Sequence, residues 1–415
     1  MKKVGVVGVG YVGLTQAIGM AQLGHSVIAY DIDQAKIEKL NKGNSPFFEP
    51  GLEEALVDAQ SKNLISFSSD ADNFINAEYI FLCLPTPQDE DGSADLTYLL
   101  EAVSNIRNVL KPNSYLIIKS TVPVNAWKQV EQIVKRDDVF VISNPEFLRE
   151  GSALFDFHNP DRIVIGATNK ELGQIVAELY ENIPSTILLT DNTSAELIKY
   201  AANSFLAMKL SFVNDIAALS DNLNASSSDV LKGVGLDKRI GNKFLTPGPG
   251  WGGSCFPKDV RALVNIADKE KIMMPLLSAA LKSNASAQDR VVDKVLKYFN
   301  QKTDAKVAIL GLAFKANTDD FRNSPAVKIA NNLKEKGFEV RCYDPQIKKH
   351  ATLATFESIH EVVNEADMLL ILTEWDDFRQ LDPKEISRNM QGRVILDTRH
   401  VLNRPTWELH KFRFL

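Results

Sequence analysis

A chain of 415 residues is too long for a single hydrophobic core, so we expect two or three domains. Its 45% hydrophobic and 24% charged residues are typical of a globular protein, and a net charge of −6 disfavours a nucleic-acid binder. Three scattered cysteines exclude a disulfide scaffold and fit a reducing cytoplasm. Because no apolar run approaches the roughly 18 residues of a membrane span, we expect a cytoplasmic protein that contacts no membrane.

The first part of the chain, residues 1–190, alternates short apolar strands with helices. Strands are predicted at residues 4–7, 26–30, 79–84, 115–119, 139–143 and 163–166. Apolar strands joined by helices indicate a parallel, doubly wound sheet, the architecture of a Rossmann domain.

A glycine-rich turn follows the first strand and opens a helix. Its sequence is Gly8-Val9-Gly10-Tyr11-Val12-Gly13. The first glycine allows the tight turn, the second allows backbone to approach a pyrophosphate, and the third allows helix and strand to pack closely. Asp31 ends the second strand, where a carboxylate can hold ribose hydroxyls and repel a 2′-phosphate. The pattern therefore predicts an NAD site, the alternative being a purely structural turn.

Two polar loops follow later strands of this sheet. One contains Ser120-Thr121-Val122-Pro123, and the other runs from Asn144 to Gly151 and carries Glu146 and Glu150. Doubly wound sheets bind ligands at the ends of their strands, so these carboxylates are candidates for acid–base chemistry. Surface ion pairs are the alternative interpretation.

The middle of the chain, residues 191–300, is predicted to be helical. The apolar spacing indicates one long helix at residues 193–223, followed by helices at 227–234, 260–268 and 275–298. Lys199 and Asn203 share one face of the long helix among apolar neighbours. An active-site role and a solvated polar face both remain open for them.

Cys255 lies in Gly250-Trp251-Gly252-Gly253-Ser254-Cys255-Phe256-Pro257-Lys258-Asp259. The glycines leave the backbone open, and a nearby cation favours the thiolate, which is the nucleophilic form. A reactive thiol in a chain with a hydride-accepting cofactor indicates oxidation through a covalent sulfur intermediate. Cys83 and Cys342, by contrast, lie in strand-like runs and are predicted to be buried.

The last part, residues 301–415, returns to strands and helices and is predicted to be a second Rossmann-like domain. Residues 336–344 repeat the Gly, Val, Tyr and Asp positions of residues 23–31. The strand ending at Gly311 is not followed by the other glycines, so we expect no ordinary dinucleotide site there. The six histidines show no metal-ligand spacing, and no metal is predicted.

Together these motifs resemble the UDP-glucose/GDP-mannose dehydrogenase family over essentially the whole chain. The matching segments are residues 8–13, 119–123, 144–151, 239–245 and 252–259, Lys199 with Asn203, and Phe314-Lys315 with residues 318–322. The resemblance implies oxidation of a nucleotide-sugar C6 alcohol to a carboxylate with two NAD, a step in nucleotide-sugar metabolism that supplies polysaccharide biosynthesis. It favours UDP-glucose as substrate and UDP-glucuronate as product, with GDP-mannose or a UDP-N-acetylhexosamine as the alternative.

The resemblance also implies roles for matching residues. Expected to act in catalysis, through a thiohemiacetal and a thioester on the cysteine, are Cys255, Lys199, Asn203, Asp259, Glu146 and Thr121. Expected to bind NAD are Gly8, Val9, Gly10, Tyr11, Val12, Gly13, Asp31, Lys36, Thr86, Thr121, Glu150, Lys258 and Arg322. Expected to bind the UDP-sugar are Glu146, Phe147, Leu148, Arg149, Glu150, Lys199, Asn203, Arg239, Phe244, Leu245, Gly252, Phe314, Lys315 and Arg399.

In this family the long helix is expected to form the core of a homodimer, with Arg239 and Arg322 acting across the subunit interface. Two other classes of protein compete with this interpretation. A one-step hydroxyacid-type dehydrogenase would need neither Cys255 nor a second α/β domain. A non-catalytic NAD-binding scaffold would have no reason to keep the set of catalytic candidates together.

Overall fold

The computed structural model describes residues 1–89 and 92–415, and the chain divides into two compact units. One unit contains residues 1–202 and 261–272, and the other contains residues 203–260 and 273–415. No helix in the described part of the chain is both long and apolar enough to cross a membrane.

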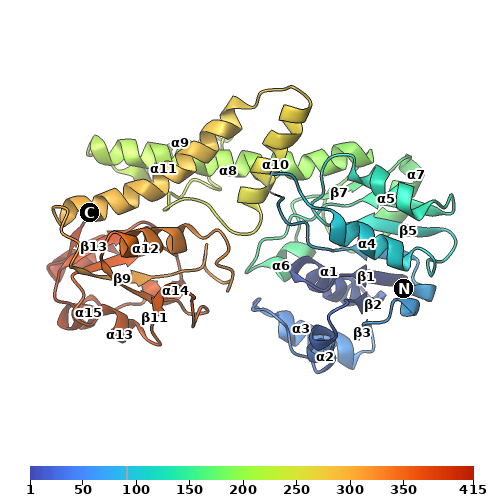
Figure 1. The fold of residues 1–415 in the computed structure, drawn as a ribbon, viewed down its shortest axis with the longest axis horizontal. Helices are drawn as coiled ribbons and strands as arrows, with labels where there is room; N and C mark the ends of the chain where they lie inside the picture. The colour runs from blue at the N-terminus through green and yellow to red at the C-terminus, as the bar shows by residue number, and fades with distance from the viewer. Residues whose placement is uncertain (90–91) are drawn as a thin grey trace. The chain divides into compact units, whose positions relative to one another are not determined.

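The first unit contains a sheet of eight described strands in the order β3-β2-β1-β4-β5-β6-β7-β8 (Figure 1). Their bounds are β1 (Lys3–Val7), β2 (Ser26–Tyr30), β3 (Ile65–Ser68), β4 (Tyr79–Leu82), β5 (Ser114–Ile118), β6 (Val139–Ser143), β7 (Ile163–Gly166) and β8 (Ile187–Thr190). The predicted strands are confirmed, but one pairing differs from the expected parallel sheet. β6 and β7 are antiparallel, because the chain enters β7 from the edge at which it leaves β6.

Helices cover both faces of this sheet. They are α1 (Tyr11–Gln22), α2 (Gln34–Asn41), α3 (Leu52–Ser61), α4 (Thr97–Ile106), α5 (Ala126–Val134), α6 (Ala153–His158) and α7 (Lys170–Ala177), with 3-10 helices η1 (Ala71–Asn76) and η2 (Glu178–Tyr180). Successive strand residues pack into different cores: Phe81 faces the core with Leu14 of α1, and Ile80 faces the core with Val103 of α4. Burial on both faces explains why a central strand such as β4 is apolar throughout.

Four helices lie between the two sheets in the sequence. They are α8 (Asn192–Asn222), α9 (Ser227–Gly235), α10 (Phe256–Lys269) and α11 (Pro275–Tyr298). The long helix is confirmed as α8. The helix predicted at residues 260–268 begins earlier, at Phe256, because Pro257 is compatible with a first helical turn. Cys255 therefore directly precedes a helix.

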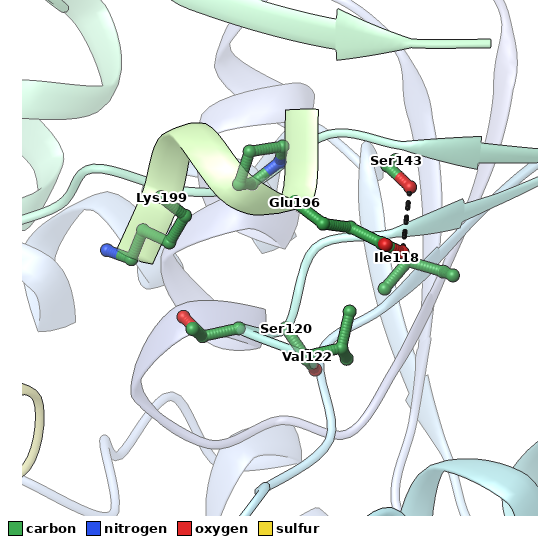
Figure 2. A pocket seen from close by; sticks show the side chains of 8 residues that line it. Ile118, Ser120, Val122, Ser143, Glu196 and Lys199 are labelled. Carbon is green, nitrogen blue, oxygen red and sulfur yellow. Dashed lines mark hydrogen bonds between the residues drawn. The ribbon is translucent and has the colours of Figure 1, made fainter. Parts of the chain in front are cut away.

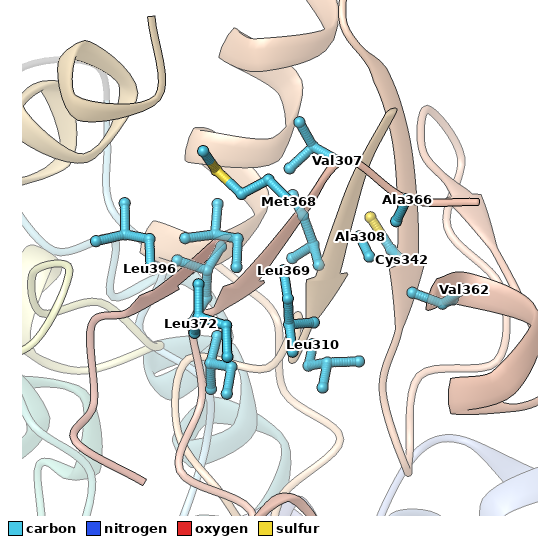
Figure 3. Packing of buried hydrophobic residues seen from close by; sticks show 14 of the residues in the cluster. Val307, Ala308, Leu310, Cys342, Val362, Ala366, Met368, Leu369, Leu372 and Leu396 are labelled. Atoms are coloured by element: carbon cyan, nitrogen blue, oxygen red, sulfur yellow. The ribbon is translucent and has the colours of Figure 1, made fainter. Parts of the chain in front are cut away.

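The second sheet has the order β11-β10-β9-β12-β13-β14, and its described pairings are parallel. Its elements are β9 (Lys306–Leu310), α12 (Pro325–Glu335), β10 (Glu339–Tyr343), β11 (Ala354–Thr355), α13 (Ile359–Val363), β12 (Met368–Ile371), α14 (Asp376–Arg379), α15 (Pro383–Asn389), β13 (Val394–Asp397), α16 (Arg404–Leu409) and β14 (Arg413–Phe414). Figure 3 shows the central strands contributing Val307, Met368 and Leu369 to one core. Cys342 is completely buried there and Cys83 is buried in the first sheet, as predicted.

Candidate active site

The glycine turn between β1 and α1 leaves room for a ligand at one position. Gly8 has a φ of +87°, and a Cβ on Gly13 would lie 1.8 Å from the Gly8 carbonyl oxygen, so neither position accepts a side chain. A Cβ on Gly10 would have no atom of the described residues within 4 Å. The open side of Gly10 at the start of α1 fits a pyrophosphate, which a helix N-terminus and close backbone favour.

Asp31 lies beside this turn and is largely buried. Its carboxylate accepts hydrogen bonds from the backbone N–H groups of Val9 and Asp33, both at 3.0 Å. The Nζ of Lys36 lies 2.8 Å from the same carboxylate. Two predicted NAD residues thus meet at the end of β2, and their arrangement fits the ribose end of a dinucleotide.

Lys199 of α8 and Glu146 of the loop after β6 form a buried ion pair with an N···O distance of 2.8 Å. Lys199 is 3% exposed, so the solvated-face interpretation is wrong. Burial opposes ionisation of Glu146, but the Lys199 charge and hydrogen bond and the Leu148 N–H hold the pKa of this carboxyl below its ordinary value. Two cations lie near the ring of Phe147, Arg162 at 3.5 Å and Lys199 at 5.4 Å from its centroid.

The other residues of this loop have different partners. Arg149 is exposed and pairs with Asp156 of α6 at 2.5 Å. Glu150 is half-buried. Thr86 donates a hydrogen bond to the carbonyl of Thr121 at 2.7 Å, which joins two predicted NAD residues from neighbouring strand ends.

A small pocket opens at this edge of the sheet (Figure 2). Its lining residues are Ile118, Ser120, Thr121, Val122, Ser143, Pro145, Glu196 and Lys199. Figure 2 shows Lys199 and Glu196 leaving α8 in different directions, with Glu196 reaching Ser143. Two catalytic candidates, Thr121 after β5 and Lys199 of α8, therefore line one pocket.

Glu196 is a buried carboxylate that lies outside the set of predicted site residues. It accepts hydrogen bonds from the backbone N–H groups of Asn125 at 2.6 Å and Trp127 at 3.0 Å, where α5 begins. Burial raises the pKa of Glu196 to about 8, although these hydrogen bonds act in the opposite direction. The residue fixes α8 to the loop after β5, one helical turn before Lys199.

Lys119 is a second buried residue missing from the predicted site. Its Nζ donates to the Oδ1 of Asn144 at 3.0 Å, and the Tyr180 hydroxyl donates to the same oxygen at 2.7 Å. Burial lowers the pKa of Lys119 to about 8. The position of Lys119 at a strand end, before Ser120 and Thr121, was a usable signal. Its long-range partner Asn144 was not visible in the sequence.

In the second unit, the glycine-rich segment before α10 is held by Trp251. The indole N–H donates to Ser211 of α8 at 2.9 Å, and the Trp251 backbone N–H donates to Asn284 of α11 at 2.7 Å. Cys255 is half-buried, and its sulfur lies 3.6 Å from the Ser254 hydroxyl oxygen. Its place just before Phe256, the first residue of α10, suits a thiolate, because helix N-termini favour anions.

Asp259 of α10 is completely buried and contacts two other candidates. The Asn203 amide donates to one of its oxygens at 2.6 Å, and Lys258 lies 2.7 Å from the other. The backbone N–H of Asp259 also donates to the Cys255 carbonyl at 2.9 Å, which makes Cys255 part of the same turn. This places Asn203, Asp259, Lys258 and the cysteine in one connected network.

The predicted UDP-sugar residues of the second unit gather around the same segment. A Cβ on Gly253 would lie 2.9 Å from the Phe314 ring, and a Cβ on Gly252 would lie 2.1 Å from the Asn323 carbonyl oxygen. Arg399 donates to the carbonyls of Phe314 at 3.2 Å and Leu372 at 3.0 Å. Close backbone packing therefore explains both glycines.

Five further predicted residues belong to this unit. The Nζ of Lys315 lies 5.5 Å from the centroid of the Phe314 ring. Leu245 is buried, and Phe244 before it has a φ of +60°. Arg239 and Arg322 are ion-paired with Asp237 and Asp320 at 2.6 and 2.8 Å. Their roles across an interface remain predictions.

Among residues 1–89 and 92–415, no group of three or more His, Cys, Asp or Glu side chains could hold a metal ion. The buried polar groups described above are instead arranged as ion pairs and hydrogen-bonded networks, which suits acid–base and nucleophilic chemistry.

The chain matches three models of one family. They are the NAD binding domain (residues 2–184), central domain (residues 193–286) and UDP binding domain (residues 308–404) of the UDP-glucose/GDP-mannose dehydrogenase family. A UDP-glucose 6-dehydrogenase of Rickettsia felis is 39% identical over 98% of this chain and 94% of its own length.

Two solved structures extend the comparison. A UDP-glucose dehydrogenase from Pyrobaculum islandicum superimposes with a TM-score of 0.91 at 35% identity, covering 98% of this chain and 96% of its own. A UDP-D-ManNAc dehydrogenase from Pyrococcus horikoshii gives a TM-score of 0.88 at 27% identity, covering 99% and 98%. The similarity extends over all three segments of the chain.

Proposed function

The chain belongs to the UDP-glucose/GDP-mannose dehydrogenase family, and on that premise we propose that it oxidises UDP-glucose to UDP-glucuronate through a thioester on Cys255. It is an NAD-dependent dehydrogenase with the NAD-binding and UDP-binding domains of that family. The observation that carries the proposal is the network around Cys255. A half-buried thiol precedes α10, and the buried Asp259 in the next turn is held by Asn203 and Lys258.

NAD would be held by the turn from Gly8 to Gly13, by Asp31 and Lys36, and by Thr86 and Thr121, which follow β4 and β5. When bound, NAD supplies the acceptor for a hydride, which removes two electrons from C6 in each oxidation. Glu150 and Thr121 would lie at the nicotinamide end. The carboxylate oxygens of Asp31 would accept hydrogen bonds from the ribose hydroxyls, and their negative charge would repel a 2′-phosphate. NAD should therefore be preferred over NADP.

Cys255 acts between the two oxidations. Its thiolate attacks the C6 aldehyde formed by the first oxidation, and a C–S bond and an oxyanion result. Lys199 and Asn203 donate hydrogen bonds to that oxygen as its charge develops. Loss of hydride from the thiohemiacetal then gives a thioester without breaking the C–S bond. Thioesters hydrolyse more readily than oxygen esters because the thiolate is the better leaving group.

Hydrolysis requires a base for water. Glu146 is ionised at neutral pH because its pKa is lowered beside Lys199, so it can accept a proton as water attacks the thioester. Asp259 would position the water through its hydrogen-bonded side chain. The C–S bond then breaks, and the products are a carboxylate and the regenerated thiolate.

The substrate is tested by NADH release with UDP-glucose, UDP-N-acetylglucosamine, UDP-N-acetylmannosamine and GDP-mannose at equal concentration. UDP-glucose should give the largest kcat/KM, and Cys255→Ser should abolish steady turnover with it. Preference for an acetamido sugar, the class named for the Pyrococcus horikoshii relative, would overturn the proposal that UDP-glucose is the substrate but would not contradict the thioester mechanism. Full activity of Cys255→Ser would contradict a mechanism through a thioester on Cys255.

We also propose that the protein works in the cytoplasm as a homodimer, or a larger assembly of dimers, built on α8. The helix exposes a stripe of large apolar side chains: Leu197, Phe205, Phe212 and Leu219. Phe205, Phe212 and Leu219 recur every seven residues, the spacing of a helix–helix seam. Light scattering should give the mass of a dimer or a multiple of it, and Phe205→Glu with Phe212→Glu should reduce it to that of the monomer.

A further inference from the structure

The side chain of Glu49 is the feature of this fold that the proposed reaction leaves unexplained. It lies in the loop between α2 and α3 and is 5% exposed. Burying a carboxylate is costly unless several donors satisfy it, so its surroundings identify what it holds in place.

Three donors from two different binding segments meet at this carboxylate. The Tyr11 hydroxyl, from the glycine turn, donates to Oε2. The backbone N–H of Gly151 donates to the same oxygen at 2.7 Å, and that of Ala153 donates to Oε1 at 2.7 Å. Burial and the Glu49 carboxylate raise the pKa of Tyr11, so its hydroxyl stays protonated and donates.

Tyr11 also contacts the second segment directly. Its hydroxyl oxygen accepts from the Gly151 N–H at 3.1 Å and lies 3.4 Å from the Arg149 carbonyl oxygen. Its ring centroid lies 5.2 Å from that of Phe47, which belongs to the Glu49 loop. Tyr11, Glu49 and Gly151 thus form one closed hydrogen-bonded unit.

The two segments joined in this way have different ligands in the proposed function. Residues 8–13 would hold the NAD pyrophosphate, and residues 146–150 would contact the sugar. The second segment is fixed at both ends, by the Glu146–Lys199 pair and by the hydrogen bonds of Gly151 to Tyr11 and Glu49. A ligand that orders one segment therefore orders the other, and the second ligand loses less conformational entropy on binding.

We infer that Glu49 is a positioning residue that couples the cofactor turn to the sugar-binding segment, so that the reduced cofactor and UDP-glucose each strengthen binding of the other. The inference rests on the proposed function. Coupling is reciprocal, so it can be measured from either ligand.

The test uses NADH with UDP-glucose, a pair that cannot react because NADH accepts no hydride. NADH fluorescence is titrated in the full-length protein with and without saturating UDP-glucose, and the coupling factor is the ratio of the two Kd values. For the wild type we expect a factor of about five or more. Tyr11→Phe keeps the ring and its contact with Phe47 but removes the hydroxyl, and its factor should fall to within about twofold of one.

Glu49→Gln should have the same effect, because an amide N–H₂ would replace one acceptor oxygen beside backbone donors. Tyr11→Phe keeps the test valid if that variant folds poorly. The matched control is Tyr115→Phe, which also removes one tyrosine hydroxyl. Tyr115 lies near the start of β5, at the end of the strand opposite to the proposed binding segments, so this variant should keep the wild-type coupling factor.

The outcomes separate the two proposals. If NADH or UDP-glucose fails to bind the wild type, the proposed function is overturned and the coupling with it. If both bind and the factor is one in the wild type, or is unchanged in Tyr11→Phe, the coupling alone is overturned. A lower melting temperature of Tyr11→Phe with an unchanged factor would show that Glu49 only stabilises the fold.

Discussion

In each of the two sheets, the second strand along the chain ends in a tyrosine that an aspartate follows: Tyr30-Asp31 at the end of β2 and Tyr343-Asp344 at the end of β10. Asp344 is 1% exposed, and its carboxylate accepts hydrogen bonds from the backbone N–H groups of Leu312, Ala313, Gln346 and Ile347. Asp31 accepts two backbone N–H groups and pairs with a single lysine at the mouth of the turn.

The helices that follow the first strands differ as well. α1 begins at Tyr11, directly after the glycine turn, so its N-terminus is available to a phosphate. After β9 the chain continues through a long loop, and α12 begins only at Pro325. That loop carries Phe314 and Lys315 instead. We therefore propose that the same strand–turn pattern serves ligand binding in one domain, whereas in the other it serves internal hydrogen bonding.

The largest effect that separates the two aspartates should be on stability. Asp344→Ala would leave four buried backbone N–H groups without their acceptor, at about 1–3 kcal/mol for each group that water cannot reach. We expect a loss of at least about 3 kcal/mol in unfolding free energy, measured by urea denaturation. Asp31→Ala should lose less and should instead raise kcat/KM for NADP relative to NAD. Equal losses of unfolding free energy in Asp344→Ala and Asp31→Ala would contradict this difference between the two aspartates.

A smaller effect should distinguish binding from folding at Gly10. The backbone there suits alanine, since φ is −77°, and a Cβ would point into open space among the described residues. Gly10→Ala should therefore keep the wild-type melting temperature without cofactor, while the Kd for NADH rises about tenfold or more. Gly233→Ala, at another open position inside α9, is the control. It should leave the Kd for NADH unchanged and should raise the melting temperature, because alanine favours a helix interior over glycine. Unchanged NADH affinity in Gly10→Ala would mean that the turn binds no pyrophosphate.

A third effect uses pH, because the buried carboxyl of Glu196 lines the pocket of the first sheet. Its pKa of about 8 in the folded protein lies above the ordinary value of 4.5, so between these limits the folded state keeps a proton that the unfolded chain releases. Stability should therefore fall as pH rises from about 4.5 to 8, by at most about 1.4 kcal/mol per pH unit from this group.

Glu196→Gln should remove this contribution, and thermal melts between pH 5 and 8 measure it. The exposed Glu181→Gln serves as the matched control and should keep the wild-type slope. A steeper fall in Glu196→Gln than in the wild type would contradict the assignment.

Local patterns predicted most of the fold. The glycine turn, the strands of the first sheet and the long helix α8 are each encoded by neighbouring residues, and they were confirmed. The antiparallel β6–β7 pairing was missed because strand direction depends on the path of a loop. The helical spacing of Lys199 and Asn203 identified their shared face, but it could not decide between solvent and burial.

Buried carboxylates were the main omission from the site. Glu49 and Glu196 each accept hydrogen bonds from segments far away in the sequence, and a carboxylate carries no local mark of such partners. Cys255 was predicted as a site residue because its glycines and charged neighbours are adjacent to it, and its role stays a prediction. Its contacts with Ser254 and the turn of Asp259 are also local. Sequence reasoning therefore works best where the site is built from consecutive residues.

The central claim is that Cys255 holds the sugar between two oxidations, and the most direct test is to count NADH. With excess NAD and a limiting amount of UDP-glucose, the reaction is run to completion and NADH is measured against the sugar consumed. The account predicts two NADH for each UDP-glucose, with UDP-glucuronate as the product. One NADH for each sugar, with an aldehyde as the product, would contradict it.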